Sequence, residues 1–155
     1  MESFKKAGKI KDWKIWINNL PQQKGVYAVT REEDIEPIFL EVGTGGFFKN
    51  ENPNVTINEL KEKWIKSNKT IMYIGKAGSD DAKKTNGSVI KKRVKAYMRF
   101  GNQKKSPHRG GKYIWQLENS GELIVWYFVC DNPEVTEGRL IKKYKPFANL
   151  KDEKI

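Results

Sequence analysis

Apolar residues recur along the chain at spacings that predict four helices. Steps of three and four residues indicate an N-terminal helix, carried by Ile10, Trp13, Trp16, Ile17 and Leu20. Thr56 and Glu59 form a capping box before a second helix that runs to about Lys66. A basic helix is predicted from about Ser88 to Gly101, with its apolar residues turned inward: Ile90, Val94, Tyr97 and Met98. Pro133 suits the first turn of a last helix, which ends before Pro146.

Between these helices, runs rich in β-branched and aromatic residues predict strands. They cover Val26–Thr30, Ile71–Gly75 and Glu122–Cys130. Residues 38–42 form a further short apolar stretch, and Tyr113–Leu117 is ambiguous between strand and helix. The glycine-rich residues 43–46 lack the spacing of a phosphate-binding loop and predict a tight turn. Helices and strands therefore alternate, which predicts one α/β domain over residues 1–155.

Composition places the chain among globular proteins. It has 155 residues, and its 37% hydrophobic content is sufficient for a packed core. The first residues lack an apolar segment typical of a signal peptide, and no apolar run is long enough to span a bilayer. Cys130 is the single cysteine, so an internal disulfide is excluded. We expect a cytoplasmic protein that does not associate with membranes.

Positive charge is concentrated in one part of the chain. The formal net charge is +11, and residues 83–112 contain eleven Lys or Arg and no Asp or Glu. A band of cations attracts polyanions because phosphates release their counterions on binding. Nucleic acid is therefore the expected partner, and the residues expected to contact it are Lys91, Lys92, Lys95, Arg99, Lys104, Lys105, His108 and Arg109. The charge predicts a partner and says nothing of an activity.

Candidate catalytic residues lie on two of the predicted helices. Arg93 and Tyr97 are one turn apart on the basic helix, where a guanidinium and a phenol can meet one phosphate. Glu134 and Glu137 lie in the first turns of the last helix, and a carboxylate there can bind a hard cation such as Mg²⁺. Taken singly, these residues are better explained as a surface cation, a packed ring and carboxylates that complement a helix dipole.

Other candidates lie on strands and in a loop. Tyr27 and Tyr73 each lie on a predicted strand, and most strand tyrosines are core residues. Lys76 follows Tyr73 and is a cation able to lower a tyrosine pKa from its usual value. His108 is the only imidazole, a candidate base or phosphate contact, although a single loop histidine is more often a bystander.

These residues occur in an order that resembles the GIY-YIG nuclease superfamily. Gly25-Val26-Tyr27 and Tyr73-Ile74-Gly75 are similar to its two signature tripeptides, and the second continues into Lys76-Ala77, as in repair-incision and restriction members. Ile90 to Tyr97 resembles the helix that carries the arginine of the family. Glu137, Leu140-Ile141-Lys142, Pro146 and Asn149 resemble its closing helix and terminal asparagine. The similarity covers residues 25–149.

The resemblance implies a small three-stranded antiparallel sheet flanked by helices, and a metal-dependent endonuclease acting on DNA. Glu137 would bind one Mg²⁺ or Mn²⁺, and Arg93 would hold the scissile phosphate. Tyr27, assisted by Lys76, would position or deprotonate the attacking water. Tyr73 and Tyr97 would line the site, and Asn149 would support it.

The chain departs from the family pattern between its first two strands. Tyr27 and Tyr73 are separated by a long segment where the family has a short hairpin, so residues 31–70 are expected to be an insertion. Residues 1–24 are expected to form a helical extension. Cleavage of both strands would require a homodimer or two successive nicks. Two other hypotheses remain: a catalytically silent nucleic-acid-binding module of the same fold, and a basic structural protein.

Overall fold

The fold is built on one antiparallel sheet. The computed structural model describes residues 1, 3–46, 52–81, 88–104 and 110–149. Its strands are β1 (Lys5–Lys9), β2 (Gly25–Thr30), β3 (Ile71–Ala77) and β4 (Ile124–Val129), arranged in the order β1-β4-β2-β3. The strand β2 is wholly buried and pairs with β3 on one side and β4 on the other. This confirms the α+β class, but the sheet has four strands where the sequence predicted three.

The additional strand β1 corrects the prediction of an all-helical N-terminal extension. It pairs antiparallel with β4, with a bulge between Lys6 and Gly8. Charged lysines on an edge strand discourage further pairing, and this polar composition hides the strand from a search for apolar runs. The predicted N-terminal helix is also shorter than expected, since only α1 (Trp13–Trp16) is α-helical, between 3₁₀ turns at Ile10–Asp12 and Ile17–Asn19.

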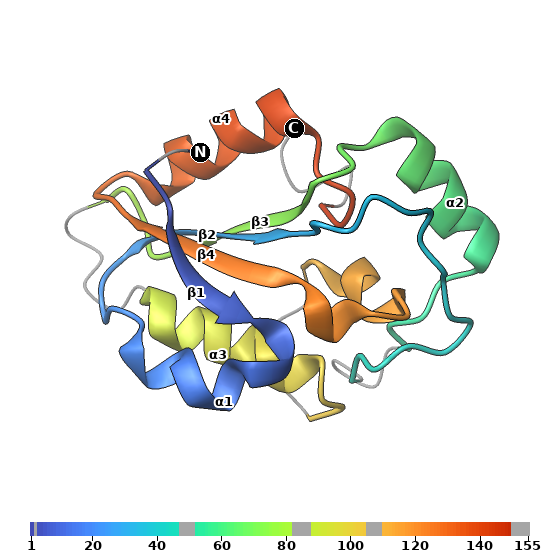
Figure 1. Cartoon of the computed structure of the whole chain (residues 1–155). Helices are drawn as coiled ribbons and strands as arrows, with labels where there is room; N and C mark the ends of the chain where they lie inside the picture. Colours follow the sequence, from blue (N-terminus) through green and yellow to red (C-terminus); the bar gives the residue numbers. More distant parts are fainter. Residues whose placement is uncertain (2, 47–51, 82–87, 105–109, 150–155) are drawn as a thin grey trace.

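Helices cover both faces of the sheet (Figure 1). The helix α3 (Ile90–Phe100) lies with α1 on one face, and α4 (Pro133–Tyr144) lies on the other. Against α3 the sheet presents Tyr27, Val29 and Tyr73, which belong to the larger hydrophobic core. Against α4 it presents a smaller set, Val26, Ala28 and Ile74, which packs with Leu140, Ile141 and Tyr144. The predicted inward residues of α3 are all buried: Ile90, Val94, Tyr97 and Met98.

Residues 31–70 connect β2 to β3 as a long excursion. The helix α2 (Ile57–Lys66) begins at Thr56, whose Oγ1 accepts a hydrogen bond from the Glu59 amide at 3.2 Å. This confirms the predicted cap. Among the described residues, the apolar stretch at 38–42 forms one bridge, between Phe39 and Leu117. The ambiguous segment is a 3₁₀ helix, Lys112–Gln116. No helix within the described ranges is long and apolar enough to cross a membrane.

Candidate active site

Three tyrosines from different elements meet on the sheet face that α3 covers. Tyr27 and Tyr73 come from the paired strands β2 and β3, and Tyr97 comes from α3. The ring centroids of Tyr73 and Tyr97 are 5.1 Å apart, and Tyr27 lies 6.1 Å from Tyr73 and 6.3 Å from Tyr97. All three residues are at least nine-tenths buried. We call these three rings the tyrosine cluster.

Glycine at position 75 makes room for this cluster. Gly75 lies directly opposite Tyr27 in the β2–β3 pairing. A Cβ atom at residue 75 would collide with the Tyr27 ring and its hydroxyl oxygen. The sheet can therefore place the Tyr27 phenol over β3 only because the facing residue has no side chain. This gives the Tyr73-Ile74-Gly75 tripeptide a structural explanation in which residue 73 supplies a ring and residue 75 supplies space.

Two charged residues of opposite sign act on the Tyr27 phenol. Burial raises the pKa of Tyr27 well above its ordinary value, and the negative charge of Glu137 raises it further, whereas the positive charge of Arg93 lowers it. Hydrogen bonds with Tyr73 and with Arg93 also lower this pKa in part. Burial dominates, so the Tyr27 hydroxyl is held in its protonated form. Arg93 of α3 therefore acts on the Tyr27 hydroxyl through its charge and a hydrogen bond, and Glu137 of α4 acts on it through its charge.

Glu137 is the buried carboxylate of α4, and Glu134 is the exposed one. Glu137 is 6% exposed. Glu134 instead forms an ion pair with Lys76 at 3.4 Å on the protein surface. Of the two carboxylates that the sequence offered for a metal, Glu137 is the buried one, and its charge acts on the Tyr27 phenol.

Lys76 is not where the hypothesis about Tyr27 requires it. Residues 73 and 75 of β3 face the tyrosine cluster, so residue 76 points to the opposite face, toward α4. The pKa of Tyr27 is raised rather than lowered, and the cation that acts on it is Arg93. Lys76 therefore contributes to the α4 side of the sheet, through Glu134.

Two further residues hold the elements that carry the site. Tyr97 donates its hydroxyl hydrogen bond to the Gly111 carbonyl oxygen at 2.6 Å, which fixes its ring in the cluster. Asp80, which the sequence analysis missed, accepts hydrogen bonds from the backbone N–H groups of Glu134 and Val135 at 2.7 and 3.2 Å. It thereby caps the N-terminus of α4 from a distant loop, and nothing in local spacing indicates this contact.

Asn149 behaves as an additional partner for the edge strand β3. Its Oδ1 accepts a hydrogen bond from the Ile74 N–H at 3.0 Å, and its Nδ2 donates to the Ile74 carbonyl at 2.9 Å. The side chain is 3% exposed. One amide thus satisfies both polar groups of a residue between Tyr73 and Gly75, and it fixes the strand on which the cluster depends.

We expect Asn149→Ala to lower the free energy of unfolding by about 2–4 kcal/mol, because two buried backbone groups of Ile74 lose their partners. Urea denaturation followed by far-ultraviolet circular dichroism measures this change. Asn58→Ala, at an exposed position of α2, is the matched control and is expected to change stability by less than about 0.5 kcal/mol. Equal effects of the two substitutions would contradict a supporting role for Asn149.

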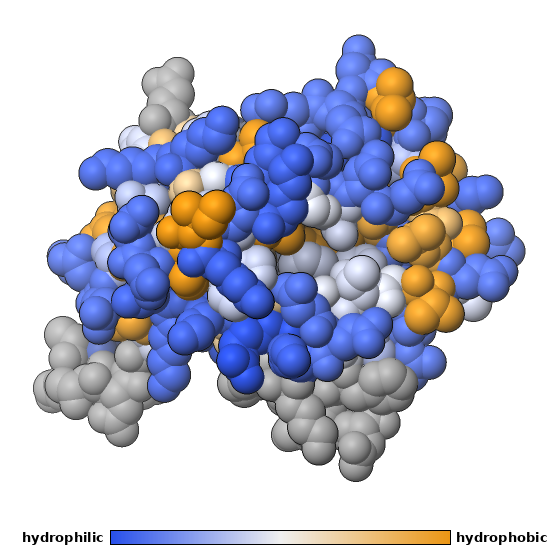
Figure 2. Space-filling model, turned by 60° about the horizontal axis from the view of Figure 1, so that its bottom comes forward, coloured by the Kyte–Doolittle hydropathy of each residue, from blue (hydrophilic) through white to orange (hydrophobic). Residues whose placement is uncertain are grey.

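The solvent-facing side of α3 is basic. Lys92, Lys95 and Arg99 are exposed and follow one another at helical spacing, and Lys104 is exposed just beyond the helix. Lys91 and Arg93 are partly buried. Lys105, His108 and Arg109 lie outside the described residues. The molecular surface on the side of α1 and α3 is predominantly hydrophilic (Figure 2).

Comparison with known proteins gives no relative. No family model, no curated protein and no solved structure matches this chain.

The donor set of the site fits a hard divalent cation at Glu137. A carboxylate and phenol oxygens are hard donors, and Mg²⁺ commonly takes only one or two protein carboxylates and completes its shell with water. Over the part of the chain that the structure describes, no three His, Cys, Asp or Glu side chains form a metal cluster. Glu137 is thus the side chain to test for cation binding.

Proposed function

We propose that this protein is an endonuclease that hydrolyses phosphodiester bonds of DNA with one bound divalent metal ion, in the manner of the GIY-YIG nucleases it resembles. One observation carries the proposal: Tyr73, Arg93 and Glu137 all act on the hydroxyl of Tyr27. The four residues come from β2, β3, α3 and α4, and the resemblance assigns a role to each. If these residues were only separate core and surface residues, there would be no reason for all of them to act on one hydroxyl.

Hydrolysis requires stabilisation of charge on the phosphate, orientation of the scissile group and placement of the attacking water. The chain has a group for each of these tasks. A Mg²⁺ or Mn²⁺ ion held by Glu137 would supply Lewis-acid stabilisation of charge on the phosphate. The planar guanidinium of Arg93 binds a phosphoryl oxygen and orients the scissile group beside the tyrosine cluster. Tyr27 meets the attacking water with a neutral hydroxyl, because burial opposes its ionisation.

This assigns Tyr27 to positioning rather than to proton removal, so the attacking water would give its proton to solvent. Its raised pKa means that the phenolate is scarce at neutral pH, so the hydroxyl orients water through hydrogen bonds. The exposed cations of α3 then bind the flanking phosphates: Lys92, Lys95, Arg99 and Lys104. Duplex binding through these residues is independent of sequence and sensitive to salt.

The test of this function is cleavage of supercoiled plasmid and of single-stranded DNA by the purified protein with Mg²⁺ or Mn²⁺. We expect nicked or linear plasmid, or shortened single strands, and no product when EDTA is present. Binding without cleavage of any substrate in either metal would refute the enzyme and leave the silent binding module as the function.

We expect the Tyr27→Phe variant to cleave about 10- to 100-fold more slowly at every pH between 6 and 9. The pKa of Tyr27 lies above its ordinary value of about 10, so the hydroxyl stays protonated across this range and its loss removes a constant factor. Single-turnover rates for both proteins, measured against pH, should give parallel profiles. A wild-type rate that climbs with pH while the variant rate stays flat would show that Tyr27 acts as an ionised base.

A further inference from the structure

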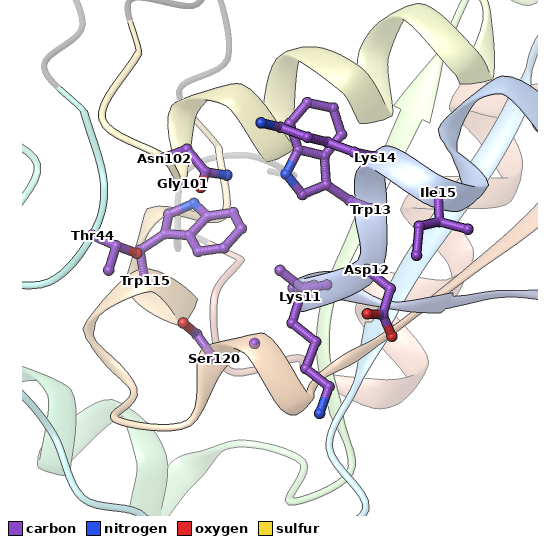
Figure 3. A pocket seen from close by; sticks show the side chains of 12 residues that line it. Lys11, Asp12, Trp13, Lys14, Ile15, Thr44, Gly101, Asn102, Trp115 and Ser120 are labelled. Carbon is purple, nitrogen blue, oxygen red and sulfur yellow. The ribbon is translucent and has the colours of Figure 1, made fainter.

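A cavity of about 390 Å³ opens at the C-terminal end of α3. It lies between the start of α1, the end of α3 and the 3₁₀ turns that precede β4 (Figure 3). We call it the tryptophan pocket, because Trp13 and Trp115 both line it. Its volume is in the range of pockets that bind small organic molecules, which is about 300–1,000 Å³.

The pocket is structurally continuous with the tyrosine cluster. The ring centroids of Trp115 and Tyr97 are 5.2 Å apart in an edge-to-face contact, and Tyr97 in turn contacts Tyr73. Trp115 is 2% exposed and forms the inner wall, whereas Trp13 is only partly buried and forms the outer wall. A ligand in the pocket therefore lies two aromatic contacts away from the residues proposed to act on the phosphate.

The pocket is rigidly built on its inner side. The Thr44 amide donates a hydrogen bond to the Trp115 carbonyl at 3.0 Å. This bond holds the loop that contains Thr44 against the 3₁₀ helix Lys112–Gln116. Gly101 lies against the Trp115 ring, where any Cβ would collide with it. Among the described residues, the Trp115 Nε1 is buried and has no hydrogen-bond partner. The inner wall is thus preformed.

The side chains that line the tryptophan pocket favour a flat, polar-edged ligand such as a nucleobase. The aromatic walls suit a flat ring, and the rim carries both donors and acceptors: Asp12, Thr44, Asn102 and Ser120. Nucleobase edges carry both kinds of group. The cations at the rim are Lys11, which is paired with Glu122 at 2.8 Å, and Lys14, whose Nζ lies 5.9 Å from the centre of the Trp13 ring. Lys14 can therefore meet the phosphate attached to a base on Trp13.

We propose that the tryptophan pocket binds an unstacked nucleobase of the strand that is cut. This inference rests on the proposed nuclease function. It adds that the preferred substrate has unpaired bases. A base can reach an aromatic wall only when it has left its own stack. The protein would accordingly favour single-stranded or unpaired segments over intact duplex.

The experiment separates base contacts from phosphate contacts and is made without catalysis. Fluorescence anisotropy, with the full chain in EDTA, compares two labelled strands of about twelve nucleotides: oligothymidylate, and an abasic strand with the same phosphates. We expect the wild type to bind the strand with bases roughly tenfold more tightly, which is the range of a single base–aromatic stack. Equal affinities for the two strands would overturn the proposal.

Variants then locate the base contact in the pocket. Thr44→Phe adds a ring to an exposed rim residue, and Val42→Phe adds the same ring two residues away at a position that is 72% exposed and outside the pocket. We expect Thr44→Phe to reduce the preference for bases to less than about twofold, with Val42→Phe like wild type. Trp13→Ala should act like Thr44→Phe, and Trp13→Phe should retain much of the preference. A preference unchanged in both Thr44→Phe and Trp13→Ala would place the base elsewhere and overturn the proposal.

Two further comparisons test whether the pocket binds a base of a strand or a free nucleotide, and whether base binding is separate from cleavage. Free thymidine monophosphate should compete only at concentrations far above those of the oligonucleotide; equal potency would identify a site for free nucleotides and overturn the proposal. If the protein cuts DNA while its preference for bases is absent, the nuclease survives and this inference fails. If it never cuts but Thr44→Phe removes the preference, the base site stands without the enzyme.

Discussion

Replacing Glu137 with glutamine is expected to abolish metal-dependent cleavage while DNA binding persists. The amide keeps the shape of a 6% exposed side chain but loses the charge that would hold a divalent cation. Loss of several kcal/mol of electrostatic stabilisation corresponds to a decrease of about 10³-fold or more in the cleavage rate. Single-turnover cleavage and calorimetric titration with Mn²⁺, each on wild type and Glu137→Gln, measure the rate and the cation affinity separately.

Glu134→Gln is the matched control for this substitution. Glu134 lies on the same helix, but it is exposed and pairs with Lys76 on the surface. Its conversion to glutamine is expected to leave the cleavage rate and the Mn²⁺ affinity within about twofold of wild type, because an exposed ion pair of this kind contributes little. Loss of activity in Glu134→Gln with activity retained in Glu137→Gln would move the cation site to the helix surface.

Arg93→Ala is expected to lower the cleavage rate by about 10²- to 10³-fold and to weaken DNA binding only about two- to threefold. Arg93 lies beside Tyr27, where its guanidinium would orient the reacting phosphate. Binding depends on many cations, since residues 83–112 alone contain eleven. Cleavage at saturating enzyme and anisotropy in EDTA separate the two effects.

Arg139→Ala removes the same charge from an exposed position on α4 and serves as the control. We expect it to match wild type in cleavage at saturating enzyme and to alter binding no more than Arg93→Ala does. If Arg93→Ala instead loses binding and cleavage to the same degree, Arg93 is a general phosphate contact and has no special part in catalysis.

Elements with a strong periodic pattern could be predicted from the sequence. The basic helix was correct within two residues at its start, and each of its four predicted inward residues is fully buried. The Thr56 cap was predicted because a capping box is a purely local arrangement of backbone and side chain. The strand β3 was also found, and it extends to Ala77. In these cases the residues that determine the element lie inside it.

The strand β1 could not be predicted in the same way. Its sequence, Lys5–Lys9, contains no large apolar side chain, and it is held by pairing with β4, more than a hundred residues away. The end of β4 was placed too far, since the apolar run continues to Cys130 although the strand ends at Val129, which is already 41% exposed. Tertiary pairing, rather than local preference, determines both outcomes.

The arrangement of the site was predictable only in part. Parity along a strand already places Tyr73 and Gly75 on one face and Lys76 on the other, so the position of Lys76 was accessible from the sequence. The cap from Asp80 to α4 and the contact between Trp115 and Tyr97 join residues with no shared spacing, and only the fold reveals them. Burial of Tyr27 likewise depends on packing, and of the two roles expected for that hydroxyl, positioning or deprotonating the water, it favours positioning.

We propose that Tyr27, Arg93 and Glu137 form a phosphodiesterase centre that uses one divalent cation. The most direct test is the single-turnover rate of DNA cleavage measured against Mn²⁺ concentration for the wild-type protein and for Glu137→Gln. We expect the wild-type rate to rise and saturate as a single-site curve, and the rate of the variant to be independent of Mn²⁺. Cleavage absent at every Mn²⁺ concentration although DNA is bound, or identical curves for the two proteins, would contradict it.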